Sequence, residues 1–437
     1  MALGRDFFVD CHDGYKNPKG KFGTFDYYLY LRNQEKKEMM RKLLFMVATA
    51  LLAAGCSSND NEEPKQPAKR TVMVYMAGEN NLSSYAQQDI NEMIDGVKSI
   101  SKWDNLIVFV DRASTREKPF IIRLRDDKNA PADTIRKYEQ DFVSSDPERM
   151  KEVLSWMMSN YPADDYGLVM WGHANGWVIM DANRRALAVD TGNNSTSGAG
   201  VWLELPDFRK VLEALPHPLK FVFADCCNVQ NVEVAYELKD VIQYLIASPA
   251  VIPGNGAPYK MIIPDLFTYD DNQLCNKVCT DYHDIVDNEN GHLPIAAIRT
   301  SAMPQLAAAT KKILKSIYET NTPINVDGLI YYYRYSNKLE EHVMYDINDF
   351  LLRHAQEADY QEWLTAFNAA VVCKKMSKKW EVQGGLDWDF GEITEERFGG
   401  VSMFIPLERY ENTILKYNTL IKQTAWYQAV GWSELGW

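Results

Sequence analysis

The sequence lacks the patterns that define several common classes of protein. It has no run of Lys and Arg, and its formal net charge is −13, whereas nucleic-acid binders usually carry a basic face. Its seven cysteines contain no pair of CxxC motifs, which excludes the usual zinc-ribbon spacing. The apolar stretch at 43–54 is too short to span a bilayer as a helix, which needs about 20 residues. We therefore expect no nucleic-acid partner and no membrane-spanning helix.

The chain does contain enough apolar residues to bury a large core. With 437 residues, it can form one large domain with elaborations, or two domains. The hydrophobic fraction of 46% and the aromatic fraction of 12% are typical of a folded chain. The net acidity is compatible with cationic substrates but by itself indicates no function.

A short segment near the N-terminus is typical of a bacterial signal peptide. Arg41 and Lys42 form a basic start, and the apolar stretch 43–54 follows. The sequence then reads Ala-Ala-Gly-Cys, which resembles a lipobox with Ala where Leu is commoner. We expect residues 39–55 to be a lipoprotein signal peptide that is removed, after which the thiol of Cys56 carries the lipid.

The segments on either side of this signal also fit a lipoprotein. We interpret residues 1–38 as a mis-annotated extension, with translation starting at Met39 or Met40. Residues 56–69 are polar, acidic and proline-bearing, which predicts a flexible tether. We expect the protein to be lipid-anchored to the bacterial envelope at the outer membrane, touching the membrane only through its lipid. Exposure at the cell surface stays open.

Strands alternate with helices along the rest of the chain. Five short apolar runs rich in β-forming residues predict buried strands at 71–76, 106–111, 166–171, 219–225 and 244–248. Amphipathic segments predict helices between them, at 149–160, 208–215 and 231–240. Because the strands are apolar on both faces, the pattern predicts an α/β fold with a mostly parallel sheet that is covered on both sides.

The domain organisation follows from the same pattern. We expect a core at 70–300 that contains the parallel sheet. Residues 301–437 are expected to be mainly helical and to return to the sheet as an apolar strand near 400–406.

A histidine and a cysteine follow two of the predicted strands. His173 comes directly after the strand 166–171, and Cys227 comes directly after the strand 219–225. Ligands of parallel sheets bind at the carboxyl ends of the strands, so we expect both side chains at one edge. A thiolate is a strong nucleophile, and a neighbouring His can generate it. Because side chains alternate along a strand, we expect Cys226 to face the core and Cys227 to face the cleft.

Several blocks resemble one known family. Residues 71–82, TVMVYMAGENNL, resemble TVLVYMAADNNL, and residues 166–177, YGLVMWGHANGW, resemble YxLVxWxHGxGW. Residues 225–227, DCC, resemble an Asp-Ala-Cys nucleophile motif. Residues 248–259 and 400–406 resemble the segment after the next strand and a late strand. The chain is therefore identified as similar to the clostripain family of cysteine peptidases.

The resemblance implies a fold, a reaction and roles for individual residues. The fold is a caspase-like three-layer α/β/α sandwich, shared with gingipains and legumains. The reaction is endopeptidase cleavage after Arg or Lys, with His173 and Cys227 as the catalytic pair and Asp225 in the S1 pocket. Ala174 stands where the family usually has Gly. Since Ala keeps its backbone N–H, Ala174 and Cys227 are expected to supply the oxyanion-hole region.

Cofactors and partners are expected from the same resemblance. The chemistry requires no cofactor, and the resemblance leaves calcium open; the residues of a metal site are unknown. Asp346 and Asp349 match acidic positions of the family, with metal binding again open. The expected partners are protein or peptide substrates with a basic P1 residue.

Two alternatives stay open. The chain could be a catalytically inactive surface lipoprotein that uses the same fold as a binding module, although the intact His–Cys pair argues against this. The segment 179–200 is rich in Gly, Asn and Ser, and it contains Arg184 and Arg185. Either the enzyme cleaves itself after one of these arginines, or they are solvated or pair with a carboxylate such as Asp181.

Overall fold

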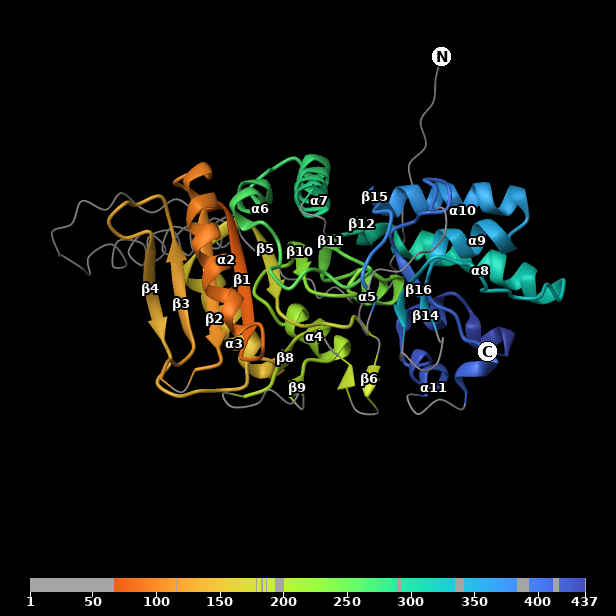
Figure 1. Ribbon diagram of the computed structural model, residues 1–437, viewed down its shortest axis with the longest axis horizontal. Helices are drawn as coiled ribbons and strands as arrows, with labels where there is room; N and C mark the ends of the chain where they lie inside the picture. Colours follow the sequence, from red (N-terminus) through yellow and green to blue (C-terminus); the bar gives the residue numbers. More distant parts are fainter. Residues whose placement is uncertain are drawn as a thin grey trace, which may run out of the picture. The chain divides into compact units, whose positions relative to one another are not determined.

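A nine-stranded sheet lies at the centre of the described chain (Figure 1). Its strand order is β15-β12-β11-β10-β5-β1-β2-β3-β4. The strands are β1 (Ala68–Gly78), β2 (Asn105–Arg112), β3 (Phe120–Leu124), β4 (Ala132–Lys137), β5 (Ala163–Trp171), β10 (Leu219–Asp225), β11 (Ile242–Ala247), β12 (Ile295–Arg299) and β15 (Val371–Lys375). The middle strands β11, β10, β5, β1 and β2 pair in parallel, and the outer strands pair antiparallel. The predicted mostly parallel sheet is confirmed.

The computed structural model describes most of the chain after the predicted tether. The described residues are 67–114, 116–177, 179–181, 184–185, 187–192, 200–288, 292–334, 342–382, 393–411 and 416–436. The predicted signal peptide, Cys56 and nearly all of the tether lie outside them. Residues from Gln66 onward belong to one compact unit. No helix in the described part of the chain is long and apolar enough to cross a membrane.

Helices cover both faces of the sheet, because each face is apolar. One face packs against α2 (Ser83–Gly96), α6 (Tyr259–Leu266) and α7 (Asp271–Asn288). The opposite face packs against α3 (Pro147–Asn160), α4 (Leu205–Glu213), α5 (Val232–Glu237) and α8 (Met303–Glu319). The fold is therefore the three-layer α/β/α sandwich that the resemblance implied.

The C-terminal part, residues 301–437, was expected to be mainly helical but also contains four strands in the described residues. Besides α8, its helices in the described residues are α9 (Ile347–His354), α10 (Glu357–Ala370), α11 (Tyr417–Ile421) and α12 (Ala425–Ala429). A three-stranded sheet joins β13 (Tyr331–Arg334), β14 (His342–Asp346) and β16 (Ser402–Phe404). The segment 400–406 does form a strand, but β16 pairs with β14 and not with the central sheet. The strand that joins the central sheet is β15, since a buried apolar run does not by itself specify its partner.

Two short hairpins follow the third parallel strand. They consist of β6 (Ile179–Asp181) with β7 (Arg184–Arg185), and β8 (Val189–Asp190) with β9 (Val201–Trp202). The second hairpin reaches back to the first strand, because the backbone N–H of Thr191 donates to the carbonyl of Glu79 at 2.9 Å. The sequence analysis assigned no strands to this segment and so missed both hairpins.

Close packing between β5 and β10 depends on a residue without a side chain. Gly167 pairs with Phe221 across the two strands, and the ring of Phe221 lies over it. A Cβ atom on Gly167 would come within 2.1 Å of Phe221 Cζ, closer than real carbon atoms approach. The position therefore requires glycine because of space.

We predict that Gly167→Ala destabilises the fold by about 1–3 kcal/mol or more, because overpacking forces the strands apart. Thermal or urea unfolding of the purified variant measures the change. Gly254→Ala is the matched control, since its Cβ would meet only ordinary contacts at 3.8 Å with Tyr85. Equal stability of the two variants would contradict the packing argument.

Candidate active site

The two candidate catalytic residues lie at the same edge of the sheet. Asp225 pairs with Trp171 in the parallel ladder between β10 and β5. His173 lies two residues after Trp171, and Cys227 lies two residues after Asp225. The pairing of the strands thus brings an imidazole and a thiol to neighbouring strand ends.

Asn81 holds the imidazole of His173. The Nε2 atom of His173 lies 2.5 Å from Asn81 Oδ1. An amide oxygen only accepts, so Nε2 carries the proton and the Nδ1 lone pair of the neutral ring stays available as a base. Burial lowers the pKa of His173 from 6.5, which keeps the ring neutral at neutral pH. The sequence argument missed Asn81, although it ends the turn after the first strand.

The thiol of Cys227 is half-buried in the described form. Its Sγ atom accepts a hydrogen bond from the backbone N–H of Ile252 at 3.4 Å. Burial raises the pKa of Cys227 to about 11, so the sulfur is protonated at neutral pH. Within the described residues, no hydrogen bond joins this sulfur to His173. Catalysis therefore requires a base that removes the proton when the substrate is bound.

Cys226 lies on the opposite face of β10 from the cleft. It is buried, and its Sγ atom donates to the carbonyl of Met170 at 3.3 Å within the core. Ala174 is buried in the same core, so its methyl group packs inward and does not cover the cleft. The replacement of Gly by Ala at this position is thereby accommodated.

Asp225 is buried and receives three hydrogen bonds. Its Oδ2 accepts from the backbone N–H of Ala257 at 3.0 Å and from Tyr259 Oη at 2.7 Å, and its Oδ1 accepts from Tyr282 Oη at 2.9 Å. Burial raises the pKa of Asp225, and these donors oppose the rise. The carboxylate thus lies under the surface, held by α6 and α7.

A second buried carboxylate lies beside Asp225. Trp171 Nε1 donates to Asp89 Oδ2 at 2.6 Å, while Asp89 Oδ1 is buried without a hydrogen-bond partner in the described chain. Burial, and next the charge of Asp225, raise the pKa of Asp89 to about 8. A Cβ on half-buried Gly256 would lie 2.8 Å from Asp225 Oδ2 and 3.5 Å from Asp89 Oδ2. A side chain at position 256 would therefore collide with this carboxylate pair.

Asp346 and Asp349 are satisfied by neighbouring donors. Asp346 caps α9 and accepts from Tyr332 Oη at 2.6 Å and from two glycine backbone N–H groups. Asp349 forms a two-point ion pair with Arg397. Both carboxylates thus serve the packing of the C-terminal part, and these contacts leave no reason to assign them a metal.

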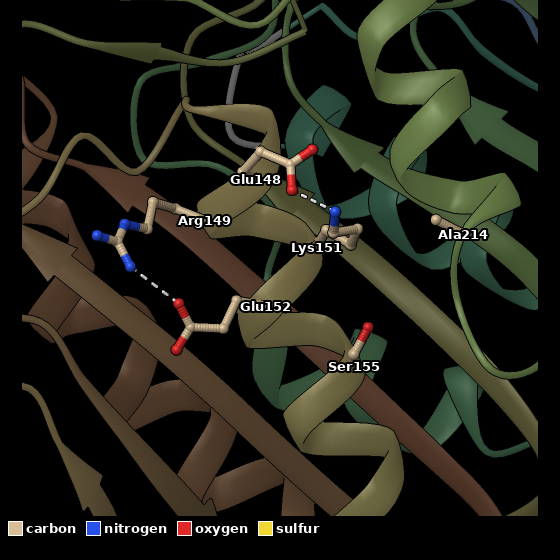
Figure 2. A pocket seen from close by; sticks show the side chains of 6 residues that line it. All are labelled: Glu148, Arg149, Lys151, Glu152, Ser155 and Ala214. Atoms are coloured by element: carbon tan, nitrogen blue, oxygen red, sulfur yellow. Dashed lines mark hydrogen bonds and ion pairs between the residues drawn. The ribbon is translucent and has the colours of Figure 1, made fainter.

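The remaining candidates lie elsewhere. Arg184–Arg185 form the short strand β7, whose side chains lie outside the description, and self-cleavage there stays a prediction. Figure 2 shows a surface hollow on α3 whose charged residues pair with one another, Glu148 with Lys151 and Arg149 with Glu152. This hollow contains none of the strand-end residues, and we assign no ligand to it.

A three-layer sandwich with a histidine and a cysteine at adjacent strand ends is typical of cysteine peptidases of the caspase-like class. The family model described as the clostripain family matches residues 74–437, and the chain belongs to this family.

Individual relatives support the assignment. Clostripain of Hathewaya histolytica is 29% identical over 233 residues, which cover 47% of this chain and 43% of that protein. The match thus spans less than half of that relative. A secreted C11 cysteine protease from Bacteroides thetaiotaomicron, solved with an irreversible peptide inhibitor, is 30% identical. It has a TM-score of 0.71 and covers 84% of this chain and 100% of its own. An inactive zymogen C11 protease from Parabacteroides distasonis shares the fold, with 24% identity, a TM-score of 0.69 and coverage of 84% and 99%.

We predict that native alkylation modifies Cys227 far faster than the other described cysteines. Cys227 is half-buried, whereas Cys226, Cys275, Cys279 and Cys373 are buried. The rate should rise between pH 7 and 9, because the thiolate fraction grows as the pH approaches the raised pKa. Peptide mapping after iodoacetamide treatment measures each site, and a urea-unfolded sample supplies the control. Comparable native labelling of Cys226 would contradict the placement of the two thiols.

Proposed function

We propose that this chain is an exported, lipid-anchored endopeptidase that cleaves after Arg or Lys through His173 and Cys227. The observation that carries the proposal is the strand register that brings the neutral His173 and the Cys227 thiol to one sheet edge. Export and anchoring rest on the signal-like segment before Cys56. The description of the similar Bacteroides thetaiotaomicron protease as secreted supports export.

His173 acts first as a base and then as an acid. Asn81 keeps the proton on Nε2, so Nδ1 takes the proton of Cys227 as the sulfur attacks the scissile carbonyl. The N–H of Ile252 donates to the sulfur and favours its charged form. The imidazolium then protonates the leaving amine, and water hydrolyses the acyl-enzyme with His173 again as base. Backbone N–H groups near Ala174 and Cys227 are proposed to bind the oxyanion.

The preference for a basic P1 residue is proposed to come from two carboxylates. Asp225 and Asp89 lie together beneath Gly256, and Asp89 Oδ1 lacks a donor in the described chain. A guanidinium or ammonium would supply both the missing hydrogen bond and the counter-charge, whereas an apolar P1 side chain would supply neither. We propose that the P1 side chain enters beside Gly256, the one of these neighbours that has no side chain.

We expect Cys227→Ala to abolish peptidase activity and His173→Ala to lower kcat/KM by about 10³-fold or more, because the nucleophile and its base act as a unit.

In the wild type, the acid limb of kcat/KM against pH should have its midpoint below 6.5. Burial lowers the pKa of His173, so its imidazole loses its proton at a lower pH than an exposed histidine does.

Exposed His217 supplies the control variant His217→Ala, which should keep full activity. A loss under about tenfold in His173→Ala would show that another base serves the thiol. An acid limb centred above pH 7 would contradict the neutral state of His173.

We expect Asp225→Asn to lower kcat/KM for Arg substrates by about 100-fold, equivalent to ~3 kcal/mol, because a buried charge partner is lost. Asp89→Asn should cause a smaller loss and weaken the preference of Arg over Leu at P1. Peptide substrates that differ only at P1 measure both effects. The control is Asp95→Asn, because Asp95 is an exposed carboxylate on α2, the helix that carries Asp89. An Asp225→Asn variant that keeps its rate and its Arg preference would refute the role.

A further inference from the structure

The first turn of α2 carries an exposed aromatic side chain at the catalytic edge. Tyr85 is 37% exposed, so part of its ring is accessible to a ligand. The side chain of a helical residue leans toward the N-terminus of its helix. Because α2 begins directly after the turn that contains Asn81, its N-terminus lies at the edge where Asn81 contacts His173. The ring of Tyr85 therefore leans toward the catalytic pair.

Two residues of the proposed active site flank Tyr85 along the chain. Asn81, four residues before it, holds the imidazole of His173. Asp89, four residues after it, shares one face of α2 with Tyr85, because residues four apart are neighbours on a helix. Tyr85 is exposed whereas Asp89 is buried. The tyrosine thus lies one helical turn closer to the catalytic edge than this carboxylate, on the same side of the helix.

The loop after β11 meets the ring of Tyr85 from the other side. A Cβ on exposed Gly254 would lie 3.8 Å from Cε2, Cζ and Oη of Tyr85. Two residues earlier in this loop, Ile252 donates its backbone N–H to Cys227 Sγ at 3.4 Å. Two residues later, Gly256 lies against the buried carboxylate pair. The ring therefore lies beside the stretch of loop that joins the nucleophile to the proposed P1 pocket.

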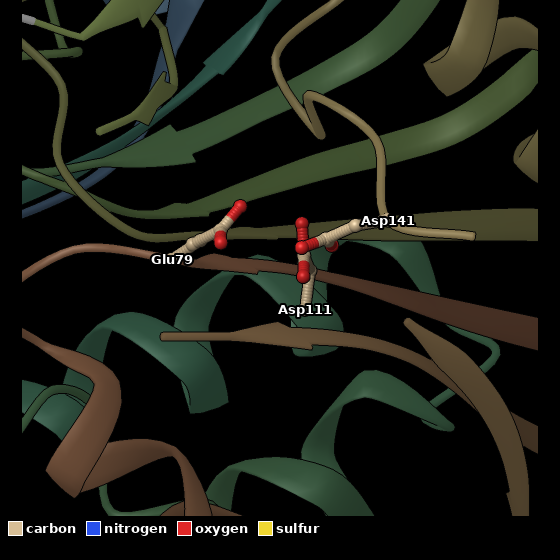
Figure 3. Close-up of side chains that lie close together, drawn as sticks. All are labelled: Glu79, Asp111 and Asp141. Carbon is tan, nitrogen blue, oxygen red and sulfur yellow. The ribbon is translucent and has the colours of Figure 1, made fainter. Parts of the chain in front are cut away.

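The other acidic group at this edge does not face Tyr85. Figure 3 shows Glu79, Asp111 and Asp141 directed toward one another. Asp111 points to the face of the sheet that α3 covers, whereas α2 covers the opposite face. A cation that passes the ring of Tyr85 therefore meets the carboxylate pair beside Gly256 and not this group.

We propose that the ring of Tyr85 stacks on the P1 guanidinium and makes the enzyme favour Arg over Lys, an inference that rests on the proposed function. A guanidinium is planar, so its N–H groups can bind carboxylates while its face lies on an aromatic ring. An ammonium group has no such face. Arg136 already shows this double contact within the chain. Its Cζ lies 4.4 Å from the ring centroid of Tyr138, and its Nη2 lies 2.9 Å from Glu152 Oε1.

Peptide substrates that differ only in Arg or Lys at P1 test the proposal in the full-length enzyme. The readout is the ratio of the two kcat/KM values, because general damage to the fold lowers both values alike. Tyr85→Ala and Tyr85→Leu should lower the Arg-to-Lys ratio by about 3- to 10-fold, since both remove the aromatic face and Leu keeps the apolar bulk. Tyr85→Phe should keep the wild-type ratio, because its ring can still stack.

Tyr318→Ala is the matched control and should also keep the ratio, because Tyr318 is an exposed tyrosine on α8, on the opposite face of the sheet. A third substrate with Leu at P1 separates this inference from the proposed function. If the wild type prefers Arg and Lys to Leu, an unchanged ratio in Tyr85→Ala and Tyr85→Leu, or an equal fall in Tyr85→Phe, would overturn the stacking role alone. A wild type that cleaves equally well after Leu would overturn the proposed function and the inference together.

Discussion

The parallel pairing of Trp171 with Asp225 determines how the catalytic edge is built. The same two residues that fix the register also hold three helices, because their side chains extend over one face of the sheet. Trp171 donates to Asp89 on α2, and Asp225 accepts from Tyr259 on α6 and Tyr282 on α7. A slip of this register would separate the thiol from the imidazole and would also break the polar contacts of all three helices.

The edge carries two groups of buried carboxyl side chains, one on each face of the sheet. Asp89 and Asp225 lie on the face covered by α2, α6 and α7, while Glu79 and Asp111 lie on the face covered by α3. Between them lies a pair that is neutral at rest, since burial lowers the pKa of His173 and raises that of Cys227. In our proposal the P1 side chain supplies the cation for Asp89 and Asp225.

Much of this architecture could be predicted from local patterns. The five parallel strands follow from apolar runs, and His173 and Cys227 follow from their places directly after two of them. Asn81 and Asp89 could not be found in this way. The role of Asn81 depends on how the turn after β1 meets the strand end at His173, and that of Asp89 on how α2 packs against Trp171. Local sequence patterns do not reveal either contact. The sequence also placed the strand β16 in the central sheet, whereas the strand found there is β15. Local patterns could not decide this, because an apolar segment fits any sheet that leaves an edge open.

The position of β15 affects where the chain can be divided. β12 is apolar along its length, and β15 pairs with it from more than seventy residues further along the chain. A fragment that stops at residue 300 would keep the pairing of β12 with β11 but would leave the opposite side of β12 as an open apolar edge. Strands of other molecules add readily to such an edge. The central sheet therefore depends on the C-terminal part of the chain to cover this edge.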